Sequence, residues 1–569
     1  MVSLSSQQRP AVAMASASED PRVPVLDVLL VGYDNQENLG LRSILAYLRS
    51  RGCTAELVPA NGGVEDPAVV EAIVARPARI VGFSIIFQYS TSEFRRLLAR
   101  LRERGVRSHF TAGGHFPSLQ PEVVLELIPD LDSVVRYEGE AVFLELLSKV
   151  DQPERWQEIG SLAFRQAGEL ILNPPRPLFT DLDTLPRLVR DAQPRFTSTG
   201  VSLASILGSR GCPFNCSFCT IRQFYEAPGG ELRRLRSPEA VVDEMAELHR
   251  SRGVRMFVFQ DDDFPVRTPG NSWLPAFHSA LEARGLVGKV FFKISCRVDD
   301  INARTLEAMV KHGLIAIYFG IESGNPLGLS ILNKQVSVQR NLASIQLVKQ
   351  YDLALAAGFM LFDPASTFAS VRENIAFLRE IGGDGFYPVN FCKMLPYAGT
   401  PIERRLREDG RLKGTLEQPD YSLLDPELDS YAFIVQQIFS QRNFSGDGLQ
   451  VALQEANFNE RLNRAVGLAD PSVNLRSPLT DLIRQANQVA LRTLEDLLAL
   501  VEQQGMDALL DNREQLLQLS QREWEEEARL EIALHKLDSG GGGNRLGLAA
   551  LYAQKHRREL EALHSPLMP

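Results

Sequence analysis

The stretch GSRGCPFNCSFC (residues 208–219) decides the fold and much of the chemistry of this chain. It holds Cys212, Cys216 and Cys219 in the spacing C-x3-C-x2-C. Four thiolates would be needed to close a tetrahedral zinc site or to ligate every iron of a cubane. Three cysteines can hold a [4Fe–4S] cluster and leave one iron open for another ligand. A zinc site completed by a distant residue and three unrelated cysteines are the alternatives.

Alternating predicted strands and helices surround this cysteine loop. Six apolar segments alternate with five amphipathic helical segments of 12–16 residues, and the loop follows the first apolar segment. Fewer than eight such units predict a partial (β/α)6 TIM-type barrel over residues 201–420, with its active site at the carboxyl ends of the strands. The six predicted strands are SLASILGSRG, MFVFQDDDF, KVFFKISCRV, AIYFGIES, LALAAGFMLF and GFYPVNFCKM.

A second α/β pattern precedes the barrel, over residues 23–150. Predicted strands at 25–33, 78–86, 107–116 and 131–140 alternate with helices, which indicates a doubly wound, Rossmann-like parallel sheet. In such sheets ligands bind beyond the carboxyl ends of the strands. Those ends carry Asp34, Asn35, Ser84, Gly113, Gly114, His115, Glu138, Gly139 and Glu140.

Three further segments complete the organisation. Residues 1–22 are typical of a disordered tail, and residues 151–200 show no sustained period and are interpreted as a linker. Residues 421–569 have helical spacing throughout and predict an α-helical domain, with a flexible joint at SGGGGN. This helical domain either covers the barrel mouth or offers a docking surface for a partner protein.

Composition excludes several classes of protein. Of 569 residues, 44% are apolar and 23% are charged, as in soluble globular proteins rather than disordered ones. A net charge of −10 indicates no nucleic-acid partner, and no apolar run is long enough to span a bilayer. Six cysteines do not form a disulfide scaffold, and the first residues lack a secretory signal. We therefore expect a cytoplasmic protein, whose oligomeric state the sequence does not indicate.

The cysteine spacing after the first barrel strand resembles the signature of the radical SAM superfamily, over roughly residues 200–415. The resemblance implies that the open iron chelates S-adenosylmethionine (SAM). One electron from the reduced cluster, delivered by an external donor of the flavodoxin or ferredoxin type, would cleave SAM to methionine and a 5′-deoxyadenosyl radical.

Further residues resemble the SAM contacts of that superfamily. Asp261 and Asp262, after the second strand, resemble the segment that receives the SAM amino group, although three consecutive acidic residues could instead cap the next helix. Ser295 and Arg297 resemble a segment that contacts the carboxylate and the ribose. Glu322 resembles a ribose acceptor, with a structural salt bridge as the alternative.

The N-terminal sheet resembles the cobalamin-binding domain of the B12-dependent radical SAM enzymes, on the segments GGHFP and VRYEGE. The resemblance places the strand-end residues named above at the corrin. Gln36 stands where the D-x-H-x-x-G motif has its cobalt-ligating His, which implies base-off cobalamin without a His ligand. A lost cofactor, and His115 as a purely structural hydrogen-bonding group, remain alternatives.

These resemblances imply a cobalamin-dependent radical SAM methyltransferase that methylates an unactivated carbon of a small-molecule substrate through methylcobalamin. Non-methylating ring contraction, cyclisation or oxidation with the same cofactors is one alternative, and a non-catalytic cobalamin- or SAM-binding regulator is another. Cys296 and Cys392 are either buried or face the active site. Aromatic residues near strand ends indicate either an apolar substrate or a core: Phe264, Phe319, Phe359, Phe362 and Tyr387.

Overall fold

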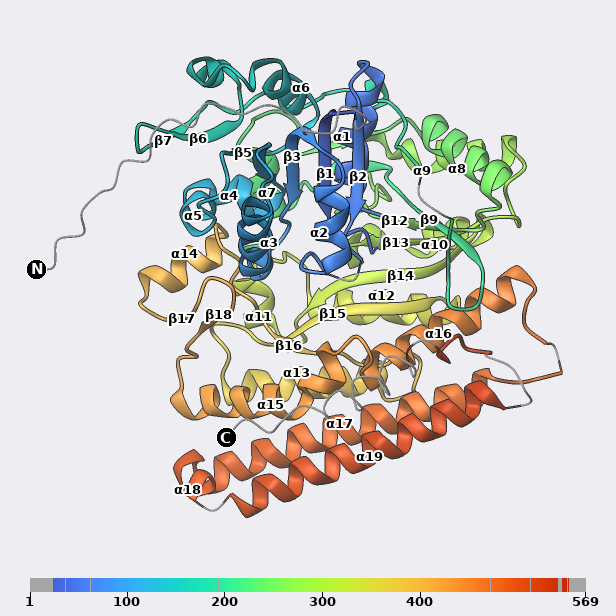
Figure 1. The fold of residues 1–569 in the computed structure, drawn as a ribbon. Coiled ribbons are helices and arrows are strands. Elements are labelled where there is room, and N and C mark those ends of the chain that lie inside the picture. Colours follow the sequence, from blue (N-terminus) through green and yellow to red (C-terminus); the bar gives the residue numbers. More distant parts are fainter. Residues whose placement is uncertain are drawn as a thin grey trace, which may run out of the picture. The chain divides into compact units, whose positions relative to one another are not determined.

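The structure, a computed structural model, describes residues 24–35, 37–61, 63–191, 194–470, 472–511, 513–540, 545–549 and 551. The predicted tail and Gln36 therefore lie outside the described residues. The chain forms two compact units, described separately below. The first holds residues up to 178 with 185–190 and 227–230, and the second holds the remainder (Figure 1).

The first unit is built on a seven-stranded sheet in the order β2-β1-β3-β4-β5-β6-β7. Strands β1 to β5 are parallel, which confirms the predicted doubly wound sheet. The order in which strands join the sheet reverses between β1 and β3, because β2 lies on one side of β1 and β3 on the other, and such sheets bind ligands at this switch point. The strands are β1 (Leu26–Gly32), β2 (Ala55–Pro59), β3 (Ala78–Ser84), β4 (His109–Gly113), β5 (Ser133–Val135), β6 (Leu162–Gln166) and β7 (Glu169–Leu172).

Six helices accompany this sheet. Their sequences place apolar residues at helical spacing, and in α1 Leu45 and Leu48 join the core beside the β1 residues Val28 and Leu30. The side chain of Asn38 accepts a hydrogen bond from Leu41 N and caps α1. The helices are α1 (Leu39–Ser50), α2 (Pro67–Val74), α3 (Thr91–Glu103), α4 (His115–Leu119), α5 (Pro121–Leu127) and α6 (Glu140–Lys149).

The segment predicted to be a linker contains a β-hairpin. Strands β6 and β7 are antiparallel, and β6 pairs with β5, so they extend the sheet. Ala167 and Gly168 form the turn with φ values of 51° and 89°. Two positive φ values are typical of the tight turn that joins twisted strands, but Ala is an unusual residue there, so the sequence pattern missed it.

The second unit contains six parallel strands in the order β16-β15-β14-β13-β12-β9, with β8 (Arg195–Phe196) antiparallel at the edge. The predicted partial barrel of six strands is confirmed. Its sixth strand has only two residues. The strands are β9 (Ser202–Ile206), β12 (Met256–Phe259), β13 (Phe291–Cys296), β14 (Leu314–Glu322), β15 (Ala354–Phe362) and β16 (Cys392–Lys393).

Five helices of the described chain pack on the outer face of this sheet: α8 (Pro238–Arg252), α9 (Trp273–Ala283), α10 (Ala303–Lys311), α12 (Val338–Gln350) and α13 (Phe368–Gly382). Two more, α11 (Pro326–Ile331) and α14 (Pro401–Glu408), adjoin the loop at Ser217. All five aromatic residues considered for an apolar substrate are buried in the core that these helices share with the strands. The core alternative therefore holds for these rings, and they give no support to an apolar substrate.

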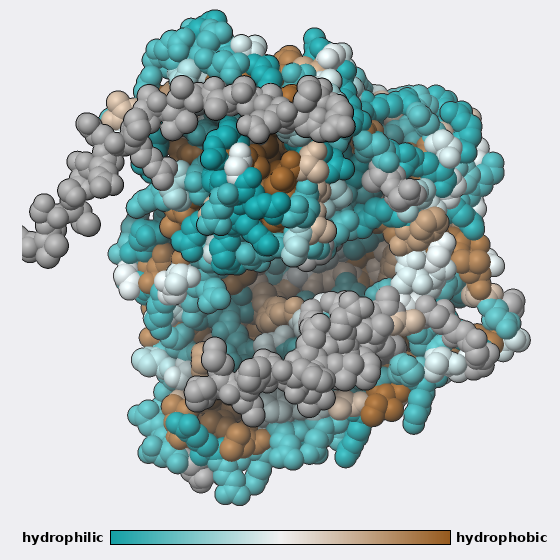
Figure 2. Space-filling model, viewed as in Figure 1, coloured by the Kyte–Doolittle hydropathy of each residue, from teal (hydrophilic) through white to brown (hydrophobic). Residues whose placement is uncertain are grey.

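The C-terminal helices are α15 (Pro426–Phe444), α16 (Leu449–Val466), α17 (Arg476–Gln504), α18 (Met506–Asp511) and α19 (Glu514–Ser539). Helices α17 and α19 lie side by side (Figure 1), and their visible surface is mostly hydrophilic with separate apolar patches (Figure 2). None of the helices in the described parts of the chain combines the length and apolar composition that a bilayer crossing requires.

Helix α16 closes the amino end of the barrel. Leu462 and Val466 form a cluster with Met256 and Phe291, the first residues of β12 and β13. Because active sites of such barrels lie at the opposite end, this helix does not cover the mouth, as the sequence had suggested for the C-terminal bundle. It forms the floor of the barrel instead.

Candidate functional site

The cysteine loop is fixed in place by backbone geometry. After β9 the chain forms β10 (Ser209–Gly211), which pairs with β11 (Arg233–Leu235), and the loop then runs to α7 (Ile221–Glu226). Gly211, directly before the first cysteine, has a φ of +88°, and a Cβ there would overlap the carbonyl oxygen of Leu232. Only glycine fits both constraints. The loop also donates a hydrogen bond from Ser217 Oγ to Ile331 O (2.8 Å).

The three thiols form one electrostatic cluster. Cys219 lies close enough to Cys212 and to Cys216 for their charges to interact. Burial raises the pKa of Cys219 to about 12 and that of Cys212 above its ordinary range, while the backbone N–H groups of Phe214 and Ile221 act in the opposite direction. Only thiolates bind iron, so metal binding must drive their deprotonation.

The arrangement fits a [4Fe–4S] cluster better than zinc. Within the described ranges, no three His, Cys, Asp or Glu side chains converge on a point where a single metal ion could bind. A [4Fe–4S] cluster does not require the three cysteine sulfurs to converge on one point, because each thiolate binds a different iron and the sulfurs lie further apart than around one ion. The spacing of Cys212, Cys216 and Cys219 therefore favours the cluster.

Arg297 contacts the cysteine loop. Its Nη1 lies 3.9 Å from Cys216 Sγ, and its guanidinium lies 3.9 Å from the centroid of the Phe214 ring. It also donates a hydrogen bond to Lys334 O (2.6 Å) and pairs with Asp299 (2.9 Å). The sequence assigned Arg297 to SAM, and the structure places it beside the cluster ligand Cys216.

The acidic segment after β12 holds the same loop from the other side. Asp261 accepts hydrogen bonds from Gly208 N (3.0 Å) and Ser209 Oγ (2.5 Å), and Asp262 accepts one from Gly211 N (2.9 Å). Burial raises the pKa of Asp261 to about 7.

The three aspartates differ in access. Asp261 and Asp263 are buried, and Asp263 pairs with Arg233 (2.9 Å). Asp262 is exposed and lies near the cysteines, so its carboxylate is the one available to a SAM amino group. The next helix, α9, is preceded by Ser272, so the helix-cap alternative for this segment was wrong.

Glu322 ends β14 with a φ of +66°, an unusual value for a non-glycine residue. Its Oε1 lies 3.2 Å from Lys334 Nζ, so the salt bridge considered for Glu322 is present. A Cβ at Gly320 would lie 2.5 Å from Glu322 Oε1 and 2.8 Å from Lys334 Nζ. Lys334 was missed because it follows a short helix and belongs to no motif. Ser295, on β13, is partly accessible and shares the inner face of the barrel with Glu322.

In the first unit, two predicted cobalamin contacts have internal partners. Asp34 forms a buried ion pair with Arg42 (2.6 Å) and accepts a hydrogen bond from Asn38 N (2.7 Å). Glu140 is buried and accepts a hydrogen bond from Ser43 Oγ (2.6 Å). Both carboxylates attach α1 to its surroundings, whereas Asn35 is exposed.

The strand ends of the first unit form a cradle of small residues. Ser84 pairs with Gly113 in the sheet, and Gly114, with a φ of +118°, lies so close to β3 that a Cβ would approach Ile85 O to 2.5 Å. His115 is half-buried, and burial lowers its pKa to about 4, so it is neutral at pH 7. Small side chains let a flat ring system approach the backbone, so this edge fits a corrin.

The turn after β5 completes this edge. Tyr137 has a φ of +64° and donates a backbone hydrogen bond to Ser118 Oγ (2.7 Å). It orients Glu138, which is half-buried, and Gly139, where a Cβ would lie 2.8 Å from the Ile44 side chain.

Exposed apolar residues follow β3 at the same edge, and the sequence analysis missed them. Ile86, Phe87 and Tyr89 are all exposed, and the rings of Phe87 and Tyr89 stack with centroids 5.2 Å apart. The apolar character of the segment around 78–86 was attributed to a buried strand, but its last residue and the short helical turn after it face outward.

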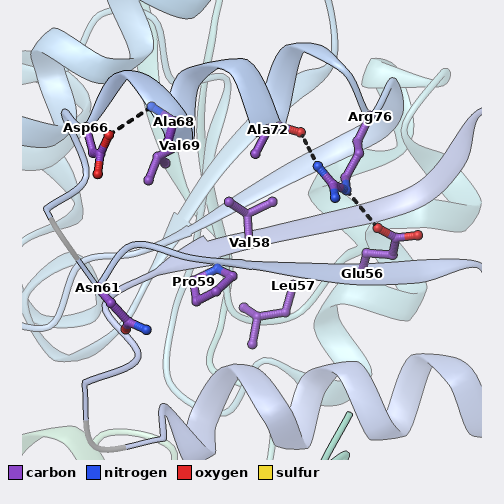
Figure 3. A pocket seen from close by; sticks show the side chains of 10 residues that line it. All are labelled: Glu56, Leu57, Val58, Pro59, Asn61, Asp66, Ala68, Val69, Ala72 and Arg76. Carbon is purple, nitrogen blue, oxygen red and sulfur yellow. Dashed lines mark hydrogen bonds and ion pairs between the residues drawn. The ribbon is translucent and has the colours of Figure 1, made fainter. Parts of the chain in front are cut away.

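A surface depression between β2 and α2 holds none of the predicted site residues (Figure 3). Its polar groups bond to one another: Arg76 Nε lies 3.0 Å from Glu56, and Asp66 caps α2 at Ala68 N (2.8 Å). It therefore does not compete with the two sites above.

Family models match both units of the chain. The radical SAM superfamily matches residues 206–378, and the B12 binding domain matches residues 26–147. These domains imply SAM with a [4Fe–4S] cluster and cobalamin, respectively.

Individual relatives agree with this pairing. An uncharacterised methyltransferase of Pyrococcus horikoshii is 28% identical over 57% of this chain and 69% of its own length. The anaerobic magnesium-protoporphyrin IX monomethyl ester cyclase of Cereibacter sphaeroides is 28% identical over 52% of this chain, which spans about half (48%) of that relative. The cobalamin-dependent SAM radical enzyme OxsB has a similar fold (TM-score 0.68, 17% identity, 93% of this chain and 84% of OxsB covered).

A B12 binding domain and a radical SAM domain thus occur together in this polypeptide, and its fold is similar to that of a cobalamin-dependent SAM radical enzyme.

Proposed function

We propose that this enzyme transfers a methyl group to an unactivated carbon of a small-molecule substrate. The observation that carries the proposal is the three-cysteine loop, with the exposed Asp262 beside it, in a chain that also has a B12 binding domain. The methyltransferase named among the relatives supports the methyl transfer. The bound cofactors would supply reductive cleavage of SAM and the transferable methyl group.

The residues of the chain divide this work. Cys212, Cys216 and Cys219 would hold the cluster. Asp262 would accept the SAM amino group, and Glu322, oriented by Lys334, would accept the ribose hydroxyls. Ser295 would contribute a further SAM contact from β13. The strand ends of the first unit would hold the corrin.

A non-methylating radical reaction is the alternative that a specific observation favours. The similarity to a cyclase is as high in identity as the similarity to the methyltransferase. A non-catalytic regulator has less support, since binding alone needs no loop with three cysteines. We further propose an external electron donor, because the chain has no second cysteine cluster among the described residues, and we retain cytoplasmic location as a prediction.

The test uses the full chain, purified and reconstituted without oxygen. We expect about four irons per chain and one cobalamin, 5′-deoxyadenosine formation with SAM and dithionite, and methylation of added cob(I)alamin by SAM, measured by chromatography. Cys219→Ala should lose iron and 5′-deoxyadenosine formation but keep cobalamin.

The alternatives differ in outcome. 5′-Deoxyadenosine without any methylation of the corrinoid would favour the non-methylating reaction. Cobalamin binding without 5′-deoxyadenosine under any reductant would favour the regulator. Zinc without iron or sulfide would contradict the radical reaction.

A further inference from the structure

One lysine points into the barrel. On β13, Phe292 and Ile294 are fully buried on the outer face with the helices, and Lys293 lies between them, partly accessible. Because side chains alternate along a strand, Lys293 shares the inner face with Phe291 and Ser295.

Lys293 has no counter-ion. Across the described parts of the chain, the structure gives its ammonium neither an ion pair nor a hydrogen bond. Burial alone lowers its pKa, and no carboxylate lies close enough to raise it. An enclosed cation without a partner is costly, so such a group indicates an anion supplied by a ligand.

The surrounding lumen offers no anion of its own. The carboxylate of Glu322 already pairs with Lys334, and the floor below Lys293 is apolar, with Leu462 and Val466 of α16. On the neighbouring β14, the register pairs Lys293 with Ala316, which adds no charge.

Tyr318 supplies a second polar group to the same space. It is 38% exposed although β14 is an interior strand of the sheet, which shows that the lumen is open at this level. Its hydroxyl lies over Gly358, where a Cβ would overlap it, and the described residues give it no hydrogen bond. Tyr318 pairs with Ser295 in the sheet, two positions closer to the mouth than Lys293.

We infer that the lumen of this barrel binds an anionic oxygen group of the substrate, a carboxylate or a phosphate, on Lys293, with the Tyr318 hydroxyl as a second hydrogen-bond donor. Lys293 lies two residues, or roughly 7 Å, below the strand-end position of Ser295. The substrate is therefore an acidic small molecule rather than an uncharged hydrocarbon. The anion site is inferred from the structure alone. Its assignment to a substrate rests on the function proposed above.

The first test measures accessibility of Lys293 in the wild-type protein by an amine-reactive reagent, with modified peptides identified by mass spectrometry. Lys289, exposed just before the same strand, is the internal control. We expect acetate or inorganic phosphate to slow modification of Lys293 about fivefold, the effect of a contact worth about 1 kcal/mol, and to leave Lys289 unchanged. Protection by acetate alone identifies a carboxylate site, and protection by phosphate identifies a phosphate site.

Two results would overturn the inference. Equal modification of Lys293 with and without either anion would show that no anion site exists. Protection by SAM alone would assign Lys293 to the cofactor.

Variants separate this inference from the proposed function. Lys293→Met should lose the thermal stabilisation that the protecting anion gives to the wild type, while Lys289→Met retains it. Substrate-independent 5′-deoxyadenosine formation should be unchanged in the control variant Lys289→Met. If the wild type forms no 5′-deoxyadenosine, the proposed function fails, but the labelling result still decides the anion site. A Lys293→Met protein that keeps the anion-dependent shift in Tm would contradict the inference.

Discussion

The position of the cysteine loop depends on the backbone conformation of Gly211. Its φ of +88° and the carbonyl of Leu232 both exclude a side chain, so Gly211→Ala should displace Cys212 and reduce iron binding. Gly230→Ala is the matched control, because Gly230 has a φ of +95° but nothing within 4 Å of a Cβ. Iron and sulfide analysis after reconstitution measures both variants. Full iron content in Gly211→Ala would show that the loop tolerates the displacement.

Arg297 places a positive charge close to Cys216, with Nη1 3.9 Å from the sulfur. Its guanidinium stacks on Phe214 and approaches the cluster ligand, so it should stabilise the reduced, more negative cluster. We expect Arg297→Gln to make the cluster harder to reduce, and Arg297→Lys, which keeps the charge but not the planar contact, to have a smaller effect. A redox titration followed by electron paramagnetic resonance tests this, and identical potentials in all three proteins would contradict it.

At the scale of single residues, the sequence indicated candidate residues but not their partners. Spacing indicated the three cysteines, and the family resemblance indicated Asp262, which the structure shows to be accessible. The sequence could not show that Asp261 lies under the loop, that Lys334 pairs with Glu322, or that Lys293 faces an open lumen, because each depends on contacts between residues far apart in the chain.

Helix α1 depends on a buried ion pair at its start. Asp34 and Arg42 are almost completely buried, and removal of one partner leaves the other charge uncompensated, so Asp34→Ala should cost about 3–5 kcal/mol. The exposed pair Glu71–Arg104 in the same unit is the control, and Glu71→Gln should cost less than about 1 kcal/mol. Thermal unfolding of both variants compares the two costs. Equal thermal unfolding midpoints in Asp34→Ala and Glu71→Gln would show that Asp34 is dispensable for folding. Asp34 would then again be a candidate cobalamin contact.

Elements with a clear period were predictable, and those without one were not. Strands β1, β12, β14 and β15 are largely apolar, β13 is apolar apart from Lys293 and Ser295, and the predicted helices α8 to α10, α12 and α13 have apolar faces. The hairpin β6–β7 has short strands and an Ala-Gly turn, and β2 is a short strand of five residues, so both escaped detection although Asn61 and the glycines after it are typical of a turn. Tertiary pairing with β5 and β1, rather than local sequence, holds these strands in the sheet.

At the scale of the whole second unit, α16 makes the barrel dependent on the C-terminal helices. The sheet is open, with β16 and β8 at its edges, and Leu462 and Val466 pack against Met256 and Phe291 at its amino end. Leu462→Ala should therefore destabilise the barrel itself by about 2–5 kcal/mol, with loss of the cluster at a lower temperature than in the wild type. Leu468→Ala, at an exposed position just after the same helix, should leave both transitions unchanged. Absorption of the cluster and circular dichroism, recorded in the same thermal scan without oxygen, distinguish the outcomes. If Leu462→Ala lowers only the helical transition and leaves the cluster absorption at its wild-type temperature, the helical domain folds independently and α16 is not a structural part of the barrel.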